Sequence, residues 1–438
     1  MQSTDRFSSF ADLAAHLDVL GLFRMRPELG KLREVLHRLA PIKPQAVIQV
    51  VGTNGKGSTA TFIASLAQAH GLRVGLYTSP HFISFRERVR INGIPANEAA
   101  LLAVANRIME AGGETLTYFE YVTALSALLF AGDAPDPVDV AVMETGLGGS
   151  WDAVTALPID MLAYTPIGLD HYRVLGDTVA AIAADKAGAI RNNVPVFSAA
   201  QHTDAMWALR EIAAMRGSFL YEVQERESLP TPIRDGGIPL GLAGEHQYTN
   251  AGLALAAWRH MARENGWQSL EEKEISALST AFIPGRMQFV PASSTHGHPA
   301  LLLDGAHNGH GMAALGKTLA AKGIAPAAVI FSCLEDKAPA EMASHLRALA
   351  TGPIFVPPIA DNPRAMKPED LAEAIGLAAS PVVDIADALA HAQDHIASYM
   401  AKEAASHPER HPVLICGSLY MLGDFFALRP DCLEKTCF

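Results

Sequence analysis

The chain has few cysteines, few charged residues and no long apolar run. Four cysteines among 438 residues, at 333, 416, 432 and 437, are too few and too irregularly spaced for a disulfide framework or a zinc site. We expect them to be reduced, with the last two in a mobile terminal tail. No segment reaches the roughly 18 consecutive apolar residues of a membrane helix, and the N-terminus carries acidic and polar residues where a signal peptide would be apolar. These absences predict a cytoplasmic protein.

Charge is also scarce and mostly negative. Charged residues make up 18% of the sequence and the formal net charge is −12, which argues against a broad nucleic-acid-binding surface. Any anionic substrate must therefore be bound by local positive charge or by a metal ion. With 49% hydrophobic residues, a chain of 438 residues can form two or three domains with buried cores.

Continuous apolar runs alternate with helical patterns along the chain, which predicts α/β domains with parallel sheets covered by helices. A first series ends before a long helical segment at 245–266, and a second begins after residue 299. We place the boundary near Arg286, which gives a larger α/β domain at 1–286 and a smaller, Rossmann-like α/β domain at 287–438. The first series of expected strands lies at 46–51, 73–77, 138–144, 160–166 and 194–198.

Between the first expected strand and a helix lies "GTNGKGS", residues 52–58. Glycines bracketing a lysine at the start of a helix are typical of a phosphate-binding loop, in which backbone N–H groups and the lysine bind phosphate oxygens. A structural alternative is a tight turn between strand and helix. The usual pattern places Ser or Thr directly after the lysine to hold Mg²⁺, but Gly57 stands there, with Ser58 one position late. The metal must therefore find other ligands.

Polar side chains follow three of the expected strands. Ser79 follows the second, Glu144 ends the third, and Asp170 and His171 follow the fourth. The carboxyl ends of parallel strands meet at one edge of a sheet, so these groups are expected to converge near the loop. Mg²⁺ needs few protein ligands when phosphate and water complete its octahedron, and these side chains are its candidates.

Lys186 lies on the apolar side of a predicted helix. Val179, Ile182, Ala183 and Ile190 keep helical spacing, and Lys186 falls on the same stripe. A lysine that faces a core is costly unless it is paired or modified, so it is either a snorkelling or ion-paired residue or a catalytic one.

Together these motifs resemble the folylpolyglutamate synthases and dihydrofolate synthases of the ATP-dependent Mur ligase superfamily. The matches occur in the family's order over nearly the whole chain. They are "GTNGKGS" (52–58), "TSPHF" with "RERVRINGIPA" (78–96), "TYFE" (117–120), "ETGLGG" with "DA" (144–153), "GLDH" with "LG" (168–176), "DKAGAIR" (185–191), "HQ", "NA" and "AL" (246–255), "PGRMQ" (284–288), "LDGAHN" (303–308) and "GSLY" (417–420).

The resemblance implies that residues 1–286 form a P-loop ATP-binding domain with the pterin site and that residues 287–438 form a glutamate-ligase domain. It also implies ATP as cofactor with two Mg²⁺ ions. Its implied metal ligands are Ser79, Glu144, His171 and Lys186, the lysine in carbamylated form. The nucleotide-binding residues that it implies are Gly52, Thr53, Asn54, Gly55, Lys56, Gly57, Ser58, Asn250, Arg286 and Asp304.

The family pattern also implies the substrate sites. Ser418 and His307 match its glutamate pocket. Phe119, Asp152 and Ala153 match the pterin site, where an aromatic face can stack and a carboxylate can accept from an amino edge. Taken singly, Phe119 would more often be core and Asp152 a turn or cap.

The implied reaction is ATP-driven amide formation through an acyl phosphate. An acyl carboxylate attacks the γ-phosphoryl group, and the amine of L-glutamate then displaces phosphate. The implied catalytic residues are Lys56, Lys186, His171 and Glu144, with charge neutralisation and positioning as the main contributions. We expect a monomer whose partners are small molecules (dihydropteroate or folate, L-glutamate and ATP), without nucleic acid or membrane.

Several positions depart from the family's usual residues: Ser150, Trp151, Thr155, Tyr172 and Gly309. They flank the expected pterin and phosphate sites, so they affect acyl-substrate identity more than ATP chemistry. A bifunctional dihydrofolate and folylpolyglutamate synthase is favoured. The alternatives are a folylpolyglutamate-only or paralogous amino-acid ligase that acts on another carboxylate, and a nucleotide-binding protein without catalysis.

Overall fold

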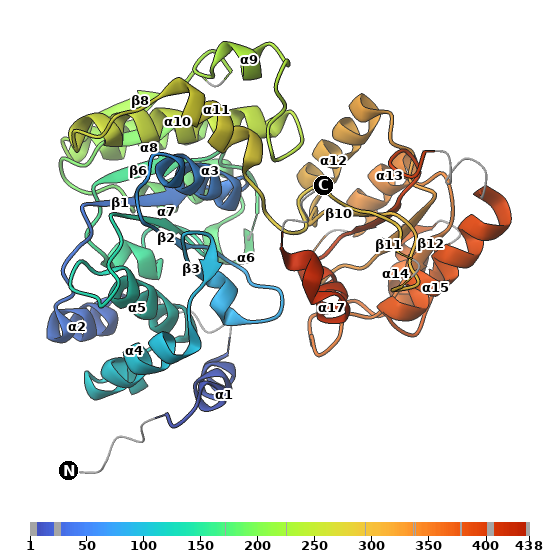
Figure 1. Cartoon of the computed structure of the whole chain (residues 1–438), viewed down its shortest axis with the longest axis horizontal. Coiled ribbons are helices and arrows are strands. Elements are labelled where there is room, and N and C mark those ends of the chain that lie inside the picture. Colours follow the sequence, from blue (N-terminus) through green and yellow to red (C-terminus); the bar gives the residue numbers. More distant parts are fainter. Residues whose placement is uncertain are drawn as a thin grey trace. The chain divides into compact units, whose positions relative to one another are not determined.

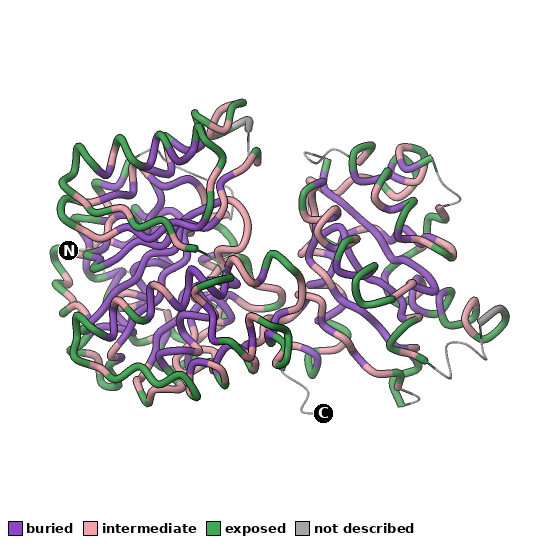
Figure 2. Tube along the Cα trace, turned by 90° about the horizontal axis from the view of Figure 1, so that it is seen from above, coloured by how far each residue is buried: buried purple, intermediate pink, exposed green. Residues whose placement is uncertain are grey.

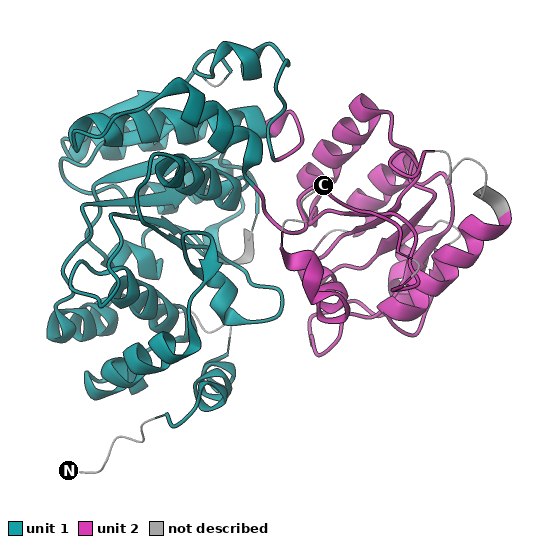
Figure 3. Ribbon diagram, viewed as in Figure 1, with its two compact units in different colours: residues 1–241, 247–281 teal, residues 242–246, 282–438 magenta. Residues whose placement is uncertain are grey.

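The computed structural model describes residues 7–21, 28–170, 172–224, 226–293, 295–335, 337, 339–376, 379–400 and 407–434. It divides into two compact units, residues 1–241 with 247–281 and residues 242–246 with 282–438 (Figure 3). The division after Ala281 falls a few residues before the boundary that the sequence indicated. Across the described ranges, none of the helices has the length and apolar character needed to cross a bilayer.

Unit 1 is built on an eight-stranded sheet in the order β4-β3-β2-β5-β1-β6-β7-β8 (Figure 1). Pairing is parallel from β2 to β8, and only the β2–β3 and β3–β4 pairs are antiparallel. The central strand β1 is buried along its whole length, as its run of apolar residues predicts. The strands are β1 Ala46–Val51, β2 Val74–Tyr77, β3 Val89–Ile91, β4 Ile94–Pro95, β5 Val140–Glu144, β6 Met161–Tyr164, β7 Val196–Ser198 and β8 Leu220–Glu222.

Helices cover both faces of this sheet, with α3, α10 and α11 on one side and α4 and α5 on the other (Figure 1). The strands and the inward helix faces form the buried core (Figure 2). The helices of unit 1 are α1 Phe10–Leu20, α2 Gly30–Leu39, α3 Lys56–Ala69, α4 Glu98–Glu110, α5 Tyr118–Phe130, α6 Tyr172–Leu175, α7 Val179–Ala187, α8 Thr203–Met215, α9 Thr231–Arg234, α10 His246–Glu264 (its first residue in unit 2) and α11 Glu271–Thr280.

Unit 2 has a six-stranded sheet in the order β13-β12-β11-β14-β10-β9, in which only the β9–β10 pair is antiparallel. Two α/β units with mostly parallel sheets confirm the predicted fold class. The strands are β9 Gln288–Val290, β10 Leu301–Leu303, β11 Ala328–Phe331, β12 Ile354–Val356, β13 Ala379–Pro381 and β14 Val413–Cys416. The helices are α12 Gly309–Lys322, α13 Pro339–Leu349, α14 Pro368–Ile375, α15 Ile385–His395 and α17 Leu419–Leu428.

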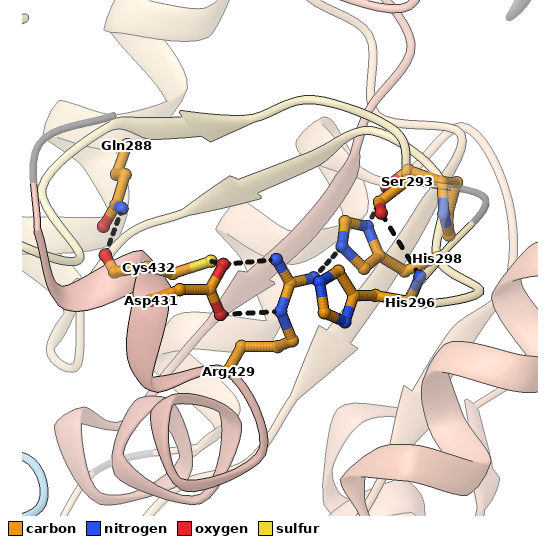
Figure 4. Close-up of polar contacts among 8 residues, drawn as sticks. Gln288, Ser293, His296, His298, Arg429, Asp431 and Cys432 are labelled. Atoms are coloured by element: carbon orange, nitrogen blue, oxygen red, sulfur yellow. Dashed lines mark hydrogen bonds and ion pairs between the residues drawn. The ribbon is translucent and has the colours of Figure 1, made fainter. Parts of the chain in front are cut away.

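Residues 429–432, near the end of the described chain, form hydrogen bonds with the β9–β10 hairpin (Figure 4). Gln288 Nε2 donates to the carbonyl of Cys432 at 2.7 Å, and Arg429 donates to both Asp431 oxygens and to His298 Nε2. Arginine can only donate, so His298 Nε2 accepts, and burial lowers the pKa of this imidazole in accord with a neutral ring. Cys432 is 1% exposed, so the expectation of a mobile tail is wrong for this cysteine. Cys437 lies outside the described residues.

Candidate functional site

The glycine-rich loop joins β1 to α3 at the carboxyl edge of the unit 1 sheet. Gly52 has φ of +151°, and a Cβ there would lie 1.9 Å from Thr165 Oγ1. Gly55 has φ of +84°, and its Cβ would lie 2.3 Å from Asn250 Oδ1. Both positions therefore require glycine. Lys56 begins α3 and donates from Nζ to the Thr53 carbonyl at 3.0 Å, so the cation lies against its own loop at the positive end of the helix.

Two of the predicted metal ligands meet beside this loop. Ser79 follows β2 and Glu144 ends β5, and the Ser79 backbone N–H donates to Glu144 Oε2 at 2.9 Å. A Cβ on Gly57 would lie 3.6 Å from both Glu144 oxygens. A hydroxyl side chain at this position, as in the common loop pattern, would therefore lie beside this carboxylate. His171 lies outside the described residues.

The donor set fits a hard cation. Glu144 is 4% exposed, its carboxylate faces the loop, and Ser79 adds a hydroxyl oxygen, which are ligand types that Mg²⁺ prefers. Within the described ranges no three His, Cys, Asp or Glu side chains are grouped as a metal cluster, so phosphate, water and the residues named above would have to complete the coordination.

Lys186 faces inward, as the helical spacing predicted, and its side chain is 3% exposed. Nζ donates to the Gly52 carbonyl at 2.9 Å, so this lysine contacts the phosphate-binding loop. Burial, and after it the nearby charge of Lys56, lowers the Lys186 pKa to about 7, against the opposing charges of Asp185, Asp152 and Asp170. A lysine with that pKa is neutral in about half of the molecules at pH 7.

A small cavity in unit 1 brings these groups together. Asp170, a candidate metal ligand at the end of a strand, lies in the wall of this cavity together with Lys56 of the loop and Lys186 of α7. It is lined by Gly52, Thr53, Lys56, Gly146, Leu147, Asp170, Leu175 and Lys186.

The second glycine-rich turn, residues 145–152, packs directly on the end of α7. A Cβ on Gly149 would lie 2.4 Å from the Lys186 carbonyl oxygen. Gly149 N–H donates to Asp185 Oδ2 at 2.9 Å, and Ser150 Oγ donates to the Asp185 carbonyl at 2.8 Å. Thr155 Oγ1 donates to the Gly149 carbonyl at 2.7 Å. Ser150, one departure from the family pattern, therefore binds this turn to the lysine-bearing helix, and Thr155, another departure, binds the turn to the 3₁₀ turn that follows it.

Asp152 is bound mainly to its own turn. Oδ2 accepts from the N–H groups of Gly146 and Leu147 at 2.8 and 3.1 Å, and Oδ1 accepts from Val154 at 3.0 Å. Burial raises the Asp152 pKa, and these three hydrogen bonds and Lys186 oppose the rise. The carboxylate thus shapes the wall in which Gly146 and Leu147 lie, in addition to any contact with substrate.

Asp152→Asn tests this arrangement. The amide replaces one acceptor oxygen by a donor that faces a backbone N–H, so we expect the free energy of unfolding to fall by about 1–3 kcal/mol and the KM for the acyl substrate to rise. Urea unfolding and steady-state kinetics measure both, with Asp18→Asn on the exposed side of α1 as the matched control. A raised KM with unchanged unfolding would mean that the carboxylate serves substrate alone.

Phe119 stands beside the same turn. The Thr117–Glu120 capping box begins α5 and places Phe119 in its first turn. The Phe119 ring would lie 3.2 Å from a Cβ on Gly146, and Ala153 directly follows Asp152 in the buried 3₁₀ turn. The three predicted pterin residues are therefore neighbours.

Asn250 lies on α10, is 2% exposed, and touches the loop at Gly55 while donating to Gln247 at 2.9 Å. Asn250 therefore contacts the glycine-rich loop, and the resemblance had implied that it binds the nucleotide.

The remaining predicted residues lie in unit 2, at the carboxyl ends of the adjacent strands β10 and β14. Asp304 accepts from the N–H groups of Met287 and Ala306, both at 2.9 Å, and its pKa is raised by burial against the opposing charge of Arg286. His307 Nδ1 donates to the Gly305 carbonyl at 2.8 Å. Ser418 caps α17. Unit 2 thus gathers Arg286, Asp304, His307 and Ser418 at one sheet edge.

The sequence did not indicate two residues, Tyr164 and Asp185, whose hydrogen bonds position the Lys186 end of α7. Tyr164 Oη donates to the Lys186 carbonyl at 2.7 Å and is fully buried. Tyr164 is the last residue of the apolar strand β6, and an aromatic residue at that position gives no sequence signal for a hydrogen bond to α7. Asp185, whose carboxylate binds Gly149, could have been suspected only from its position beside Lys186.

A glycine-rich strand-to-helix loop with a lysine at one edge of a parallel sheet, and a second α/β unit, define a two-domain nucleotide-dependent α/β protein. The family model "Mur ligase, glutamate ligase domain" matches residues 285–419. The dihydrofolate synthase/folylpolyglutamate synthase of Bacillus subtilis is 31% identical, over 95% of this chain and 98% of the relative. The chain belongs to the dihydrofolate synthase/folylpolyglutamate synthase family.

Solved structures agree over the full length. Escherichia coli FolC in complex with DHPP and ADP superposes with a TM-score of 0.81 at 28% identity, covering 97% of this chain and 98% of that one. The bifunctional folylpolyglutamate synthase/dihydrofolate synthase of Yersinia pestis, complexed with AMPPNP and a Mn ion, gives 0.79 at 27% identity, with 97% and 98% covered.

Proposed function

We propose that this protein joins L-glutamate to dihydropteroate and to folates in an ATP-dependent ligation through an acyl phosphate. The observation that carries the proposal is the contact between the loop and its surroundings: Lys186 Nζ binds the Gly52 carbonyl, and Glu144 faces the loop at Gly57. Full-length similarity to ligases of this family, together with the ADP and AMPPNP of the related structures, supports it.

The loop would bind the β- and γ-phosphates through the N-terminal amides of α3 and through Lys56. An oxygen of the acyl carboxylate attacks the γ-phosphorus, the bond to the bridging oxygen breaks, and ADP leaves. The glutamate amine then attacks the acyl carbon, phosphate departs with the bonding electrons, and the nitrogen loses a proton. Lys56 and the loop amides stabilise the charge that develops on the phosphoryl oxygens.

We further propose two Mg²⁺ ions held by Ser79, Glu144, His171 and carbamylated Lys186, which would supply additional charge neutralisation at the phosphates. The Mn ion of the Yersinia pestis complex supports a divalent metal in this family. Arg286, Asp304 and Asn250 are proposed for the nucleotide, His307 and Ser418 for glutamate, and Phe119, Asp152 and Ala153 for the pterin.

The decisive assay measures ADP release with glutamate and dihydropteroate, with glutamate and tetrahydrofolate, and with glutamate alone, followed by mass spectrometry of the products. We expect ADP with both pteridines and a product heavier by one glutamyl residue in each case. ADP release with tetrahydrofolate but not with dihydropteroate would mean that the enzyme adds glutamate only to folates. No pteridine-dependent ADP release would contradict the proposal.

A further inference from the structure

The segment from the 3₁₀ turn Phe85–Arg88 to the start of α4, residues 85–98, carries three arginines, and two of them donate to oxygen acceptors in this segment. Arg86 donates from Nε to the Ala96 carbonyl at 2.9 Å and from Nη1 to Glu98 at 2.6 Å. Arg90 donates from Nε to the Glu87 carbonyl and from Nη1 to the Gly93 carbonyl, at 3.1 and 3.2 Å. Both cations therefore have oxygen acceptors and act within the segment.

Arg88 differs from both. It is 2% exposed, and its Nε donates to the nitrogen Nδ1 of His81 at 2.7 Å. Its Nη1 is buried and has no hydrogen-bond partner within the part of the chain that the structure describes. A buried guanidinium keeps its charge, so an unpaired N–H there costs the desolvation penalty of a charged donor.

The described contacts of the Arg88 guanidinium are with a histidine and two aromatic rings. Because arginine can only donate, His81 Nδ1 accepts the hydrogen bond from Arg88 Nε, and this ring nitrogen carries no proton. The guanidinium carbon lies 5.3 Å from the ring centre of Tyr118 and 5.4 Å from that of Phe119, which gives cation–π contacts but no acceptor oxygen. Within the described residues, these contacts leave the Nη1 donor of Arg88 without an acceptor.

Phe119 links this cation to the candidate active site. Tyr118 is 3% exposed, whereas Phe119 is half-buried, so Phe119 is the more accessible of the two rings that contact the Arg88 guanidinium. The same ring borders Gly146, which lines the cavity that holds Lys56 and Lys186. One aromatic ring thus separates Arg88 from the wall of that cavity.

We propose that Arg88 binds an acceptor oxygen of the acyl substrate, beside the Phe119 ring on which the substrate's aromatic part stacks. This inference rests on the proposed function and extends it to a specificity-determining residue. Two sources offer such an oxygen: the ring carbonyl of the pteridine, and the carboxylate that becomes phosphorylated. A charge-assisted hydrogen bond from a rigid, buried guanidinium suits either one.

Arg88→Met tests the inference, because methionine keeps much of the apolar packing of the stem and removes every donor. With the full-length enzyme, we expect the KM for dihydropteroate to rise about 10- to 100-fold and the KM for ATP to stay unchanged. Arg86→Met and Arg90→Met are the matched controls, because each loses a donor that is already satisfied within the segment; the KM for dihydropteroate should hold in both.

A substrate pair identifies the oxygen. The 2,4-diamino analogue of dihydropteroate lacks the ring carbonyl but keeps the carboxylate. If Arg88→Met weakens binding of the oxo compound alone, the acceptor is the ring carbonyl. If it weakens both and also lowers kcat, the acceptor is the carboxylate. Either result supports the inference.

Unchanged KM values for both substrates in Arg88→Met would overturn it, and would leave Arg88 a packing residue. Should the methionine variant not fold, Arg88→Lys keeps the charge and loses the planar fork; on the same inference its KM for dihydropteroate rises, and an unchanged value overturns it. Wild-type turnover is measured alongside: its absence would contradict the proposed function, whereas normal wild-type turnover with an unaffected variant contradicts only the role of Arg88.

Discussion

Replacing Lys186 by alanine is expected to lower kcat about 1,000-fold or more while ATP still binds. The Lys186 side chain is 3% exposed and its Nζ lies 2.9 Å from the Gly52 carbonyl oxygen, so it acts where the phosphates would lie. On the proposed mechanism it carries a carbamate that holds a metal ion, and alanine removes that ligand. Isothermal titration should still detect nucleotide, since the loop amides and Lys56 remain.

The chemistry of this lysine favours carbamylation. The neutral amine attacks the carbon of CO₂, and the nitrogen then loses a proton to solvent. A Lys186 pKa of about 7 leaves about half of the amine neutral at pH 7, whereas an ordinary lysine has roughly one neutral molecule in a few thousand. Activation by CO₂ should therefore rise with pH through about 7 and level off above it.

Lys186→Arg separates the two possible roles of this residue. Arginine keeps the positive charge but does not form a carbamate, so an anionic role predicts an inactive variant and a cationic role predicts an active one. Carbon-13 NMR of the protein equilibrated with labelled bicarbonate provides a readout that does not depend on turnover, and Lys186→Ala should remove the carbamate signal. An active arginine variant, or activity unaffected by exhaustive removal of CO₂, would eliminate the carbamate.

The central strands could be predicted because burial on both faces of a sheet requires a continuous run of apolar residues. The run at 46–51 coincides with β1, and the runs at 138–144 and 160–166 contain β5 and β6. The short strands β3, β4 and β8, at or next to the two edges of the sheet, were not predicted. They have only two or three residues each, and they include an arginine, a proline and a glutamate that read as loop.

The candidate site was predictable to the same degree. The inward direction of Lys186 follows from helical spacing, and the meeting of Ser79 with Glu144 follows from strand order. The contacts that fix these groups did not follow. The three backbone N–H groups that donate to Asp152 are placed by the path of a turn. The hydrogen bond from the Tyr164 hydroxyl to the Lys186 carbonyl depends on packing between β6 and α7. Neither leaves a periodic pattern in the sequence.

Gly149→Ala should have the second large effect, because it acts where the glycine-rich turn meets α7. A Cβ at this position would lie 2.4 Å from the Lys186 carbonyl oxygen and 2.6 Å from its Cα. Both are backbone atoms, so no side-chain rotation relieves the contact. The Tyr164 hydroxyl and the Ser150 hydroxyl hold this end of α7. We expect the free energy of unfolding to fall by about 1–3 kcal/mol, as measured by urea denaturation.

Gly168→Ala is the matched control. It follows the next strand at the same sheet edge, and an added Cβ there meets no atom within 4 Å. Its unfolding free energy should change by less than about 0.5 kcal/mol. Equal stabilities of the two alanine variants would mean that the turn and the helix separate without cost.

The activity of Gly149→Ala then distinguishes packing from function. If the turn moves to make room, Gly146 and Leu147 shift in the cavity wall and Lys186 loses its fixed distance to Gly52. Turnover should therefore fall further than the loss of folded protein accounts for, at a temperature where the variant remains folded. Full turnover of the folded variant would show that Lys186 needs no support from this turn. The glycine would then serve packing alone, and the position of the lysine would depend on Tyr164 and on α7 itself.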